Sequence, residues 1–264
     1  MRGTASMGAV EVGEQGPVTV LTLREPRKRN ALSPEMRGEL SLRLREATRA
    51  NTCRAIVLTG ADGHFCAGGD MQSSQIDNGP DLLRTLSNAL PLQDIIRLIA
   101  TGPKPVIVAV EGVAAGAGLS LVAACDIVVA SQDATFHAAF PKVGLMPDTG
   151  ILWSLPRRVG AAKANYLLIS GVDLSAPEGL QLGLVDQMVP KGTALEKAIT
   201  LALSIADMAP LSVAATRGVI GRAAELESVL AAERQIQPLL TLTADYAEGR
   251  DGFRNRRKPQ FSGK

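Results

Sequence analysis

The stretch His64-Phe65-Cys66-Ala67-Gly68-Gly69-Asp70 contains two adjacent glycines. It follows Ala55-Ile-Val-Leu-Thr59, a short apolar run that predicts a buried strand. Paired glycines allow a sharp turn and let a ligand approach main-chain N–H groups closely. Taken alone, the stretch fits a ligand-binding turn and an ordinary strand-to-helix turn equally well.

A second glycine-rich stretch, Gly112-Val-Ala-Ala-Gly116-Ala117-Gly118-Leu-Ser120, has the same setting. It follows the buried strand predicted at 105–110 and begins a helix, whose first N–H groups lack partners and carry partial positive charge. It is not a dinucleotide fingerprint, because the third glycine is missing, and no Lys-Ser/Thr follows as in a phosphate-binding loop. The stretch predicts either an anion-stabilising helix N-terminus or a contact between small residues.

Outward from these two stretches, buried strands alternate with helices over three-quarters of the chain, which predicts an α/β core with helices covering the sheet. Further strands are predicted at 18–23, 126–130, 135–136 and 184–189, and helices at 33–50 and 81–100. Ser33 as N-cap with Pro34 after it, and Ser175-Ala-Pro-Glu, are typical helix starts. From 194 to 249 only helices are expected, with a break at Pro210. The predicted division is a flexible tail at 1–16, a core at 17–200 and a C-terminal helical module at 201–264.

Composition gives no reason to expect nucleic acid or a membrane as a partner. The formal net charge is +2, and the longest apolar stretch, 106–130, is interrupted by Glu111, glycines and Asp126. The three cysteines are an odd number without C-x-x-C spacing, so a disulfide scaffold and a zinc site are not expected. We expect a cytoplasmic protein without a metal site.

Several motifs resemble, in order and spacing, those of the enoyl-CoA hydratase/isomerase (crotonase) superfamily. They are Arg29-Asn-Ala-Leu-Ser33, Phe65-Cys-Ala-Gly-Gly-Asp70, Lys104-Pro-Val-Ile-Val-Ala-Val-Glu-Gly112, Ala124-Cys-Asp126, Gly144-Leu-Met-Pro147, Gly183-Leu-Val-Asp186 and Arg257-Lys-Pro-Gln-Phe261. The resemblance implies a crotonase-like spiral of ββα units and a C-terminal helical module that assembles trimers, often paired to hexamers. It also implies an acyl-CoA thioester substrate and no separate cofactor, since coenzyme A is part of the substrate.

The resemblance also implies an oxyanion hole formed by the backbone N–H groups of Gly69 and Ala117. Such donors stabilise the enolate that forms when a thioester loses a proton from Cα. Residues near the two turns, and weaker candidates in a neighbouring subunit's tail, are implied to hold coenzyme A or substrate: Arg27, Lys28, Arg29, Ala31, Ala67, Gly68, Asp70, Gly116, Phe253 and Lys258. A solvated basic surface is the alternative for residues 27–29.

The sequence departs from the family where hydratases carry two glutamates. Alignment through the motifs puts Ser120 and Phe140 at these positions, and neither side chain can usefully transfer a proton. The usual two-glutamate hydration is therefore disfavoured. Phe140 is expected to form an apolar wall of the acyl pocket. Ser120 is a candidate pocket residue, or else a small buried helix residue.

A different acid, Asp148, lies in Val143-Gly-Leu-Met-Pro-Asp148-Thr-Gly150, which resembles the isomerase branch of the family. That branch includes Δ3,Δ2-enoyl-CoA isomerases and ring-opening isomerases of phenylacetyl-CoA degradation. The leading hypothesis is an enoyl-CoA isomerase in which Asp148 moves the proton, and burial would raise its pKa. A helix N-cap is the alternative role for Asp148. The alternative functions are a hydratase with atypical acids and a catalytically silent acyl-CoA-binding paralogue.

Overall fold

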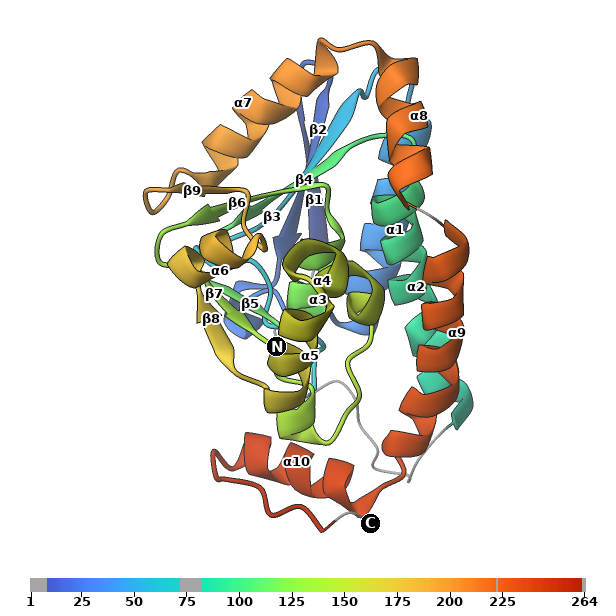
Figure 1. Ribbon diagram of the computed structural model, residues 1–264, viewed down its shortest axis with the longest axis vertical. Coiled ribbons are helices and arrows are strands. Elements are labelled where there is room, and N and C mark those ends of the chain that lie inside the picture. Colours follow the sequence, from blue (N-terminus) through green and yellow to red (C-terminus); the bar gives the residue numbers. More distant parts are fainter. Residues whose placement is uncertain (1–8, 72–81, 222, 263–264) are drawn as a thin grey trace, which may run out of the picture.

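The structure is a computed structural model that describes residues 9–71, 82–221 and 223–262. Its main sheet has six strands in the order β1-β2-β3-β4-β6-β9, and a small sheet has the order β5-β7-β8 (Figure 1). β1 is antiparallel to β2, and the other neighbours in the main sheet are parallel. The strands are β1 (Ala9–Gln15), β2 (Val18–Arg24), β3 (Ala55–Gly60), β4 (Val106–Val110), β5 (Val113–Ala115), β6 (Ile127–Ser131), β7 (Thr135–His137), β8 (Asp173–Ser175) and β9 (Gln187–Val189).

The central strands are continuous apolar runs because both faces of the main sheet are covered. All five residues of β4 are buried, and the alternate side chains of the sheet enter two separate apolar clusters. One cluster holds α1 (Pro34–Arg49), α2 (Leu82–Thr101) and α3 (Ala117–Ala124), and the other holds α7 (Ala194–Ala206). α7 lies close to the sheet because the buried side chains on its inner face are alanines. The predicted α/β core is confirmed.

Two predicted helix starts are confirmed in atomic detail. Ser33 caps α1, since its Oγ accepts the Met36 N–H at 3.2 Å, and Pro34 occupies the first helical position. Ser175 begins α6 (Ala176–Leu182) with a capping box in which Glu178 returns a hydrogen bond to the Ser175 N–H. Both signals depend only on local sequence, which is why they could be predicted.

The remaining helices build one side and one end of the molecule. α4 (Ile151–Val159) and α5 (Ala161–Ser170) follow the central segment, and α8 (Pro210–Gly221), α9 (Ala223–Leu240) and α10 (Ala244–Arg254) follow α7. Figure 1 shows α8 and α9 along one side and α10 across one end. α9 packs on α2, and α10 packs on the short 3₁₀ helix η2 (Pro141–Val143). The ion pair between Arg217 and Asp126 ties α8 to the core.

The predicted domain boundaries need two corrections. The prediction of a flexible tail at 1–16 is wrong from residue 9 onward, because residues 9–15 form β1, which pairs with all of β2. Residues 1–8 lie outside the described residues. β1 is an edge strand that buries only Val10, so its sequence lacks a clear apolar alternation. The division after residue 200 falls inside α7, which packs on the main sheet, so the helices that leave the core begin with α8.

Two smaller differences concern individual elements. The strand predicted at 184–189 is limited to β9, and the predicted helix start at Asp81 lies outside the described residues. No single described helix is long and apolar enough to cross a membrane, although α7 and α8, bent by 109° at their junction, meet the length and composition criteria as a pair.

Candidate active site

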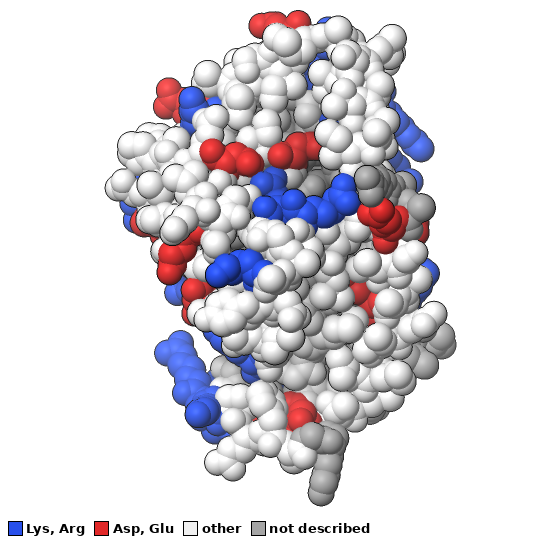
Figure 2. Space-filling view, in the orientation of Figure 1, with Lys and Arg blue, Asp and Glu red and all other residues white. Residues whose placement is uncertain are grey.

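A cavity of about 1240 Å³ lies between the two glycine-rich turns, the segment from η2 to α4, and the C-terminal helices. Both turns, the 139–149 segment, α9 and α10 contribute to its wall. Several cations line it: Arg27, Lys28, Arg29, Arg37, Lys142, Arg234, Arg256 and Arg257. On the face drawn in Figure 2, Lys and Arg side chains form a band across the middle and a group beside the end where α10 lies.

Gly69 directs its N–H away from the neighbouring backbone. Leu32 N donates to Gly68 O at 2.7 Å, and Asp70 N donates to Leu32 O at 3.3 Å. Because successive residues of an extended strand point their polar groups to opposite sides, the N–H of the intervening Gly69 faces away from Leu32. Gly69 lines the cavity, so this donor is available to a ligand there.

Ala117 supplies a second main-chain donor at the first position of α3. Its N-cap is Gly116, with φ +50°, and the first N–H groups of a helix have no partner within the helix. Small residues bring this helix start against the first turn. A Cβ on Gly118 would lie 2.5 Å from Cys66 O, and a Cβ on Gly68 would lie 3.5 Å from Ala117 N. Both predicted donors therefore line one cavity at closely packed turns.

Asp148 lines the same cavity, on the turn before α4. Its Oδ2 accepts a hydrogen bond from Gln237 Nε2 at 2.8 Å, and its Oδ1 accepts one from Thr149 Oγ1 at 3.0 Å. Burial raises the pKa of the Asp148 carboxyl, while these two hydrogen bonds and the charge of Arg37 oppose the rise. α4 begins after Gly150 with no side-chain cap, so the alternative role of Asp148 as its N-cap is wrong.

Four of the cavity residues that were missed in the sequence lie around Asp148 or the start of α4: Arg37, Thr149, Glu233 and Gln237. Glu233 is 3% exposed, and both of its carboxyl oxygens accept the Gly150 N–H at 3.1 Å. Glu233 and Gln237 are four residues apart and so share one face of α9. This spacing indicated that the two polar side chains lie on the same face of the helix. The sequence did not indicate which part of the chain that face contacts.

Most residues predicted to hold coenzyme A or substrate line this cavity. They are Arg27, Lys28, Arg29, Ala31, Ala67, Gly68, Asp70, Gly116, Phe140 and Phe253. Lys28 Nζ forms a 2.6 Å ion pair with Asp70, which is 5% exposed, and this contact raises the pKa of Lys28. Phe140 is 6% exposed and presents an apolar surface. Phe253 lines the cavity of its own chain, whereas its predicted contact was with a neighbour's site.

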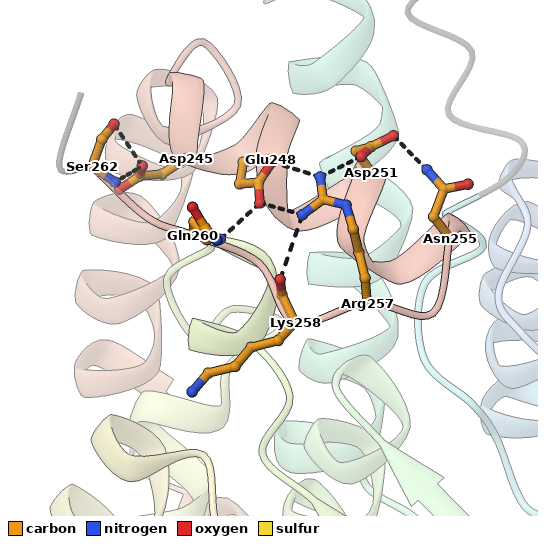
Figure 3. Close-up of polar contacts among 8 residues, drawn as sticks. All are labelled: Asp245, Glu248, Asp251, Asn255, Arg257, Lys258, Gln260 and Ser262. Carbon is orange, nitrogen blue, oxygen red and sulfur yellow. Dashed lines mark hydrogen bonds and ion pairs between the residues drawn. The ribbon is translucent and has the colours of Figure 1, made fainter.

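Two predicted residues do not reach the cavity. Ser120 is wholly buried, and its hydroxyl donates to the main-chain oxygens of Asp148 at 3.0 Å and of Gly116 at 3.3 Å. It is therefore the small buried helix residue of the two alternatives, and it supports the turn that carries Asp148. Lys258 is exposed, whereas its neighbour Arg257 lines the cavity and binds Glu248 (Figure 3).

The other candidate side chains have structural partners. His137 lines the cavity, but Nδ1 lies 2.9 Å from Asp173 Oδ1 and Nε2 lies 3.0 Å from Thr135 Oγ1. Cys66 is fully buried, and burial raises the pKa of its thiol to about 12, which disfavours the reactive thiolate. Within the described part of the chain, no group of three or more His, Cys, Asp or Glu side chains could hold a metal ion.

The fold and the cavity together define an α/β enzyme of the crotonase-like class. The family model described as enoyl-CoA hydratase/isomerase matches residues 13–264, and the chain belongs to this family. It is 39% identical to the 1,2-epoxyphenylacetyl-CoA isomerase of Escherichia coli (strain K12) over 254 residues, which cover 95% of this chain and 97% of that protein. It is 36% identical to the 2,3-dehydroadipyl-CoA hydratase of the same organism, with 98% and 100% of the two chains covered.

Solved structures show the same fold. An enoyl-CoA hydratase from Mycobacterium avium subsp. paratuberculosis K-10 superposes with a TM-score of 0.87 at 28% identity, covering 96% of this chain and 98% of that one. An enoyl-CoA hydratase from Polaromonas sp. JS666 has a TM-score of 0.78 at 37% identity, covering 97% and 100%. The predicted crotonase-like α/β fold is confirmed, and the chain is an acyl-CoA enzyme of this family.

Proposed function

We propose that this protein is an enoyl-CoA isomerase that shifts a double bond through an enolate, with Asp148 as the proton-carrying base. One observation carries the proposal: Asp148 is a half-buried carboxylate on the wall of the cavity that the Gly69 and Ala117 turns also line. The two positions at which family hydratases carry glutamates hold Ser120 and Phe140. The similarity to an isomerase at 39% identity supports the same choice.

The proposed chemistry follows from the acidity of a thioester. Removing a proton from C2 places negative charge on the carbonyl oxygen, and two preorganised N–H donors stabilise that charge; the loss of one such donor costs about 10²–10³-fold in rate. Asp148 accepts the C2 proton and returns a proton at C4 of the dienolate. The burial that raises the Asp148 pKa makes it a stronger base.

The cations at the cavity mouth suit the phosphates of coenzyme A. Arg27 and Arg29 flank Lys28, whose charge is partly neutralised by Asp70, and Arg256 and Arg257 approach from the C-terminal segment. No cofactor beyond the coenzyme A of the substrate is included in the proposal. We also propose that the protein assembles into trimers or hexamers through its C-terminal helices and that it is cytoplasmic.

Hydration by an atypical set of acids is the second candidate. It is favoured by the similarity to a hydratase at 36% identity and by a second carboxyl, Glu233, on the cavity wall. A silent acyl-CoA-binding protein is the third candidate, and the buried base with its hydrogen-bonded support argues against it.

Incubation of the purified protein with a 3-enoyl-CoA and a 2-enoyl-CoA separates the three functions. A double-bond shift supports the proposal, water addition supports the hydratase, and binding by calorimetry without product supports the silent protein. Asp148→Asn should abolish the shift while CoA-ester affinity stays within about threefold. Asp133→Asn is the matched control, because Asp133 is an exposed carboxylate paired with Lys191. Near-normal turnover by Asp148→Asn would exclude Asp148 as the base.

A further inference from the structure

The helix α9 brings two polar side chains to the turn that carries Asp148. Gln237 donates to Asp148 Oδ2 at 2.8 Å and to Met146 O at 3.1 Å. Glu233, one turn earlier, lines the cavity and approaches the same segment at Gly150. Gln237 therefore orients Asp148, whereas Glu233 adds a second carboxyl to the cavity wall.

Glu233 is fixed by contacts that leave its proton available. Both of its oxygens lie 3.1 Å from Gly150 N, at the start of α4, and Thr149 N–H also contributes a hydrogen bond. One carboxyl oxygen can accept these N–H groups while the other carries a proton, because a protonated carboxyl is both donor and acceptor. Thr149 and Gly150 both have positive φ, of 58° and 71°, which turns their N–H groups toward this side chain.

The groups around Glu233 favour its protonated form. Its burial and the neighbouring negative charge of Asp148 raise the pKa of its carboxyl to about 8. Among the cations that line the cavity, Arg234 lies on α9 itself, and Arg37 from α1 acts on Asp148, where its charge opposes the rise in the carboxyl pKa that burial causes. α2 faces the site with the neutral Leu92 and Gln93, and α10 with Tyr246.

Two carboxyls that share a cavity titrate as a pair, and their protons leave in two steps. Asp148 accepts side-chain hydrogen bonds and feels the charge of Arg37, which favour its ionised form, whereas burial and the charge of Asp148 favour the protonated form of Glu233. A base and an acid side by side are the two groups that a double-bond shift requires.

We propose that Glu233 is a second catalytic carboxyl, the acid that delivers a proton to the acyl C4 atom while Asp148 removes one from C2. The inference rests on the isomerase function proposed above and changes its proton path. The C2–H bond breaks, its proton goes to Asp148, and the electron pair forms the dienolate. The Glu233 O–H bond then breaks, its proton forms the new C4–H bond, and the double bond moves to C2=C3. Asp148 loses its proton to water and Glu233 regains one from water, so the enzyme is restored.

Isotope transfer distinguishes one proton carrier from two. The substrate is 3-hexenoyl-CoA with deuterium at both C2 positions, in ordinary water, and the product is analysed for deuterium at C4. Wild-type protein should give product without deuterium at C4, because Glu233 carries a solvent proton. Glu233→Gln keeps an oxygen for the Gly150 N–H but has no acidic proton, so kcat should fall by about 10²-fold or more. Its residual product should carry deuterium at C4, since Asp148 then acts alone.

Glu227→Gln is the matched control, because Glu227 lies on α9 two turns from Glu233 and forms an exposed pair with Arg97. Its kcat and isotope pattern should match those of the wild type. Deuterium at C4 of the wild-type product would overturn the proposal, and so would a kcat of Glu233→Gln within twofold of wild type. A wild-type protein that does not isomerise the substrate refutes the proposed function itself, and this inference with it.

Discussion

A methyl group at position 68 would test whether the closeness of the two glycine-rich turns sets the rate. In Gly68→Ala, the new Cβ would lie 2.7 Å from the main-chain oxygen of Ala115 in β5, whereas even tight Cβ contacts lie at 3.0–3.4 Å. The two backbones must therefore separate by about 0.3–0.7 Å, and a misplacement of about 1 Å can cost about 10²-fold in rate. Since Gly69 follows directly, its N–H would move with the backbone. We expect kcat to fall by about 10–10²-fold.

The same substitution also places alanine at φ +93°, which has a cost of its own. Backbone strain of this kind is worth about 1–3 kcal/mol of folding free energy. Gly63 provides the control, because its φ is +76° but a Cβ there would meet no atom within 4 Å. Gly63→Ala should lose stability to a similar degree and keep its kcat.

The assay is isomerisation of 3-hexenoyl-CoA at saturating substrate, with thermal denaturation measured in parallel. If Gly68→Ala and Gly63→Ala lose stability equally and both keep wild-type kcat, the packing of the two turns does not control the chemistry. If both lose kcat equally, the effect belongs to backbone strain rather than to the contact with β5.

Three further predictions follow from individual contacts. The Glu233 carboxyl has a pKa of about 8 in the folded protein and its usual value of 4.5 in the unfolded chain, so ionised Glu233 lowers the stability of the fold as pH rises between these values. The melting temperature of Glu233→Gln relative to wild type should therefore increase from pH 5 to pH 8. A constant difference would contradict the raised pKa. Ser120→Ala removes the hydroxyl that donates a hydrogen bond to the main-chain oxygen of Asp148, so the variant should lose about 1 kcal/mol of unfolding free energy in denaturant titrations. Its KM should stay within twofold of wild type. A large rise in KM would mean that Ser120 binds substrate. Arg257→Met breaks the exposed pairs with Glu248 and Asp251 shown in Figure 3, so the melting temperature should change little while calorimetry shows weaker CoA-ester binding; unchanged affinity would exclude Arg257 from the binding site.

Features that depend on a few adjacent residues could be predicted from the amino-acid sequence alone. The strands β2, β3, β4 and β6 are apolar runs, and the caps at Ser33 and Ser175 act within one helical turn. The paired glycines at 68–69 indicated a sharp turn and the stretch at 112–120 a helix start, and the structure has both, with positive φ at Gly68 and Gly116. These predictions succeeded because a strand, a cap and a turn are each specified by a few adjacent residues.

The edge strand β1 shows where local information was insufficient. It buries only Val10, and its remaining residues face solvent, so its composition resembles that of a tail. Its pairing with β2 depends on the presence of an adjacent strand, which the sequence of residues 9–15 does not encode. The role of Ser120 was open for a related reason, since the sequence placed it near the site but could not show which way its hydroxyl points.

The surroundings of Asp148 depend on the packing of segments that are far apart in the sequence. Gln237 is 89 residues away along the chain, and Glu233 is 83 residues from Gly150, yet both lie on the cavity wall. α9 reaches this place by packing on α2, through side chains that resemble those of any amphipathic helix. The sequence around Glu233 and Gln237 therefore does not indicate that they lie near Asp148. The residues that surround them become their neighbours only when the chain folds.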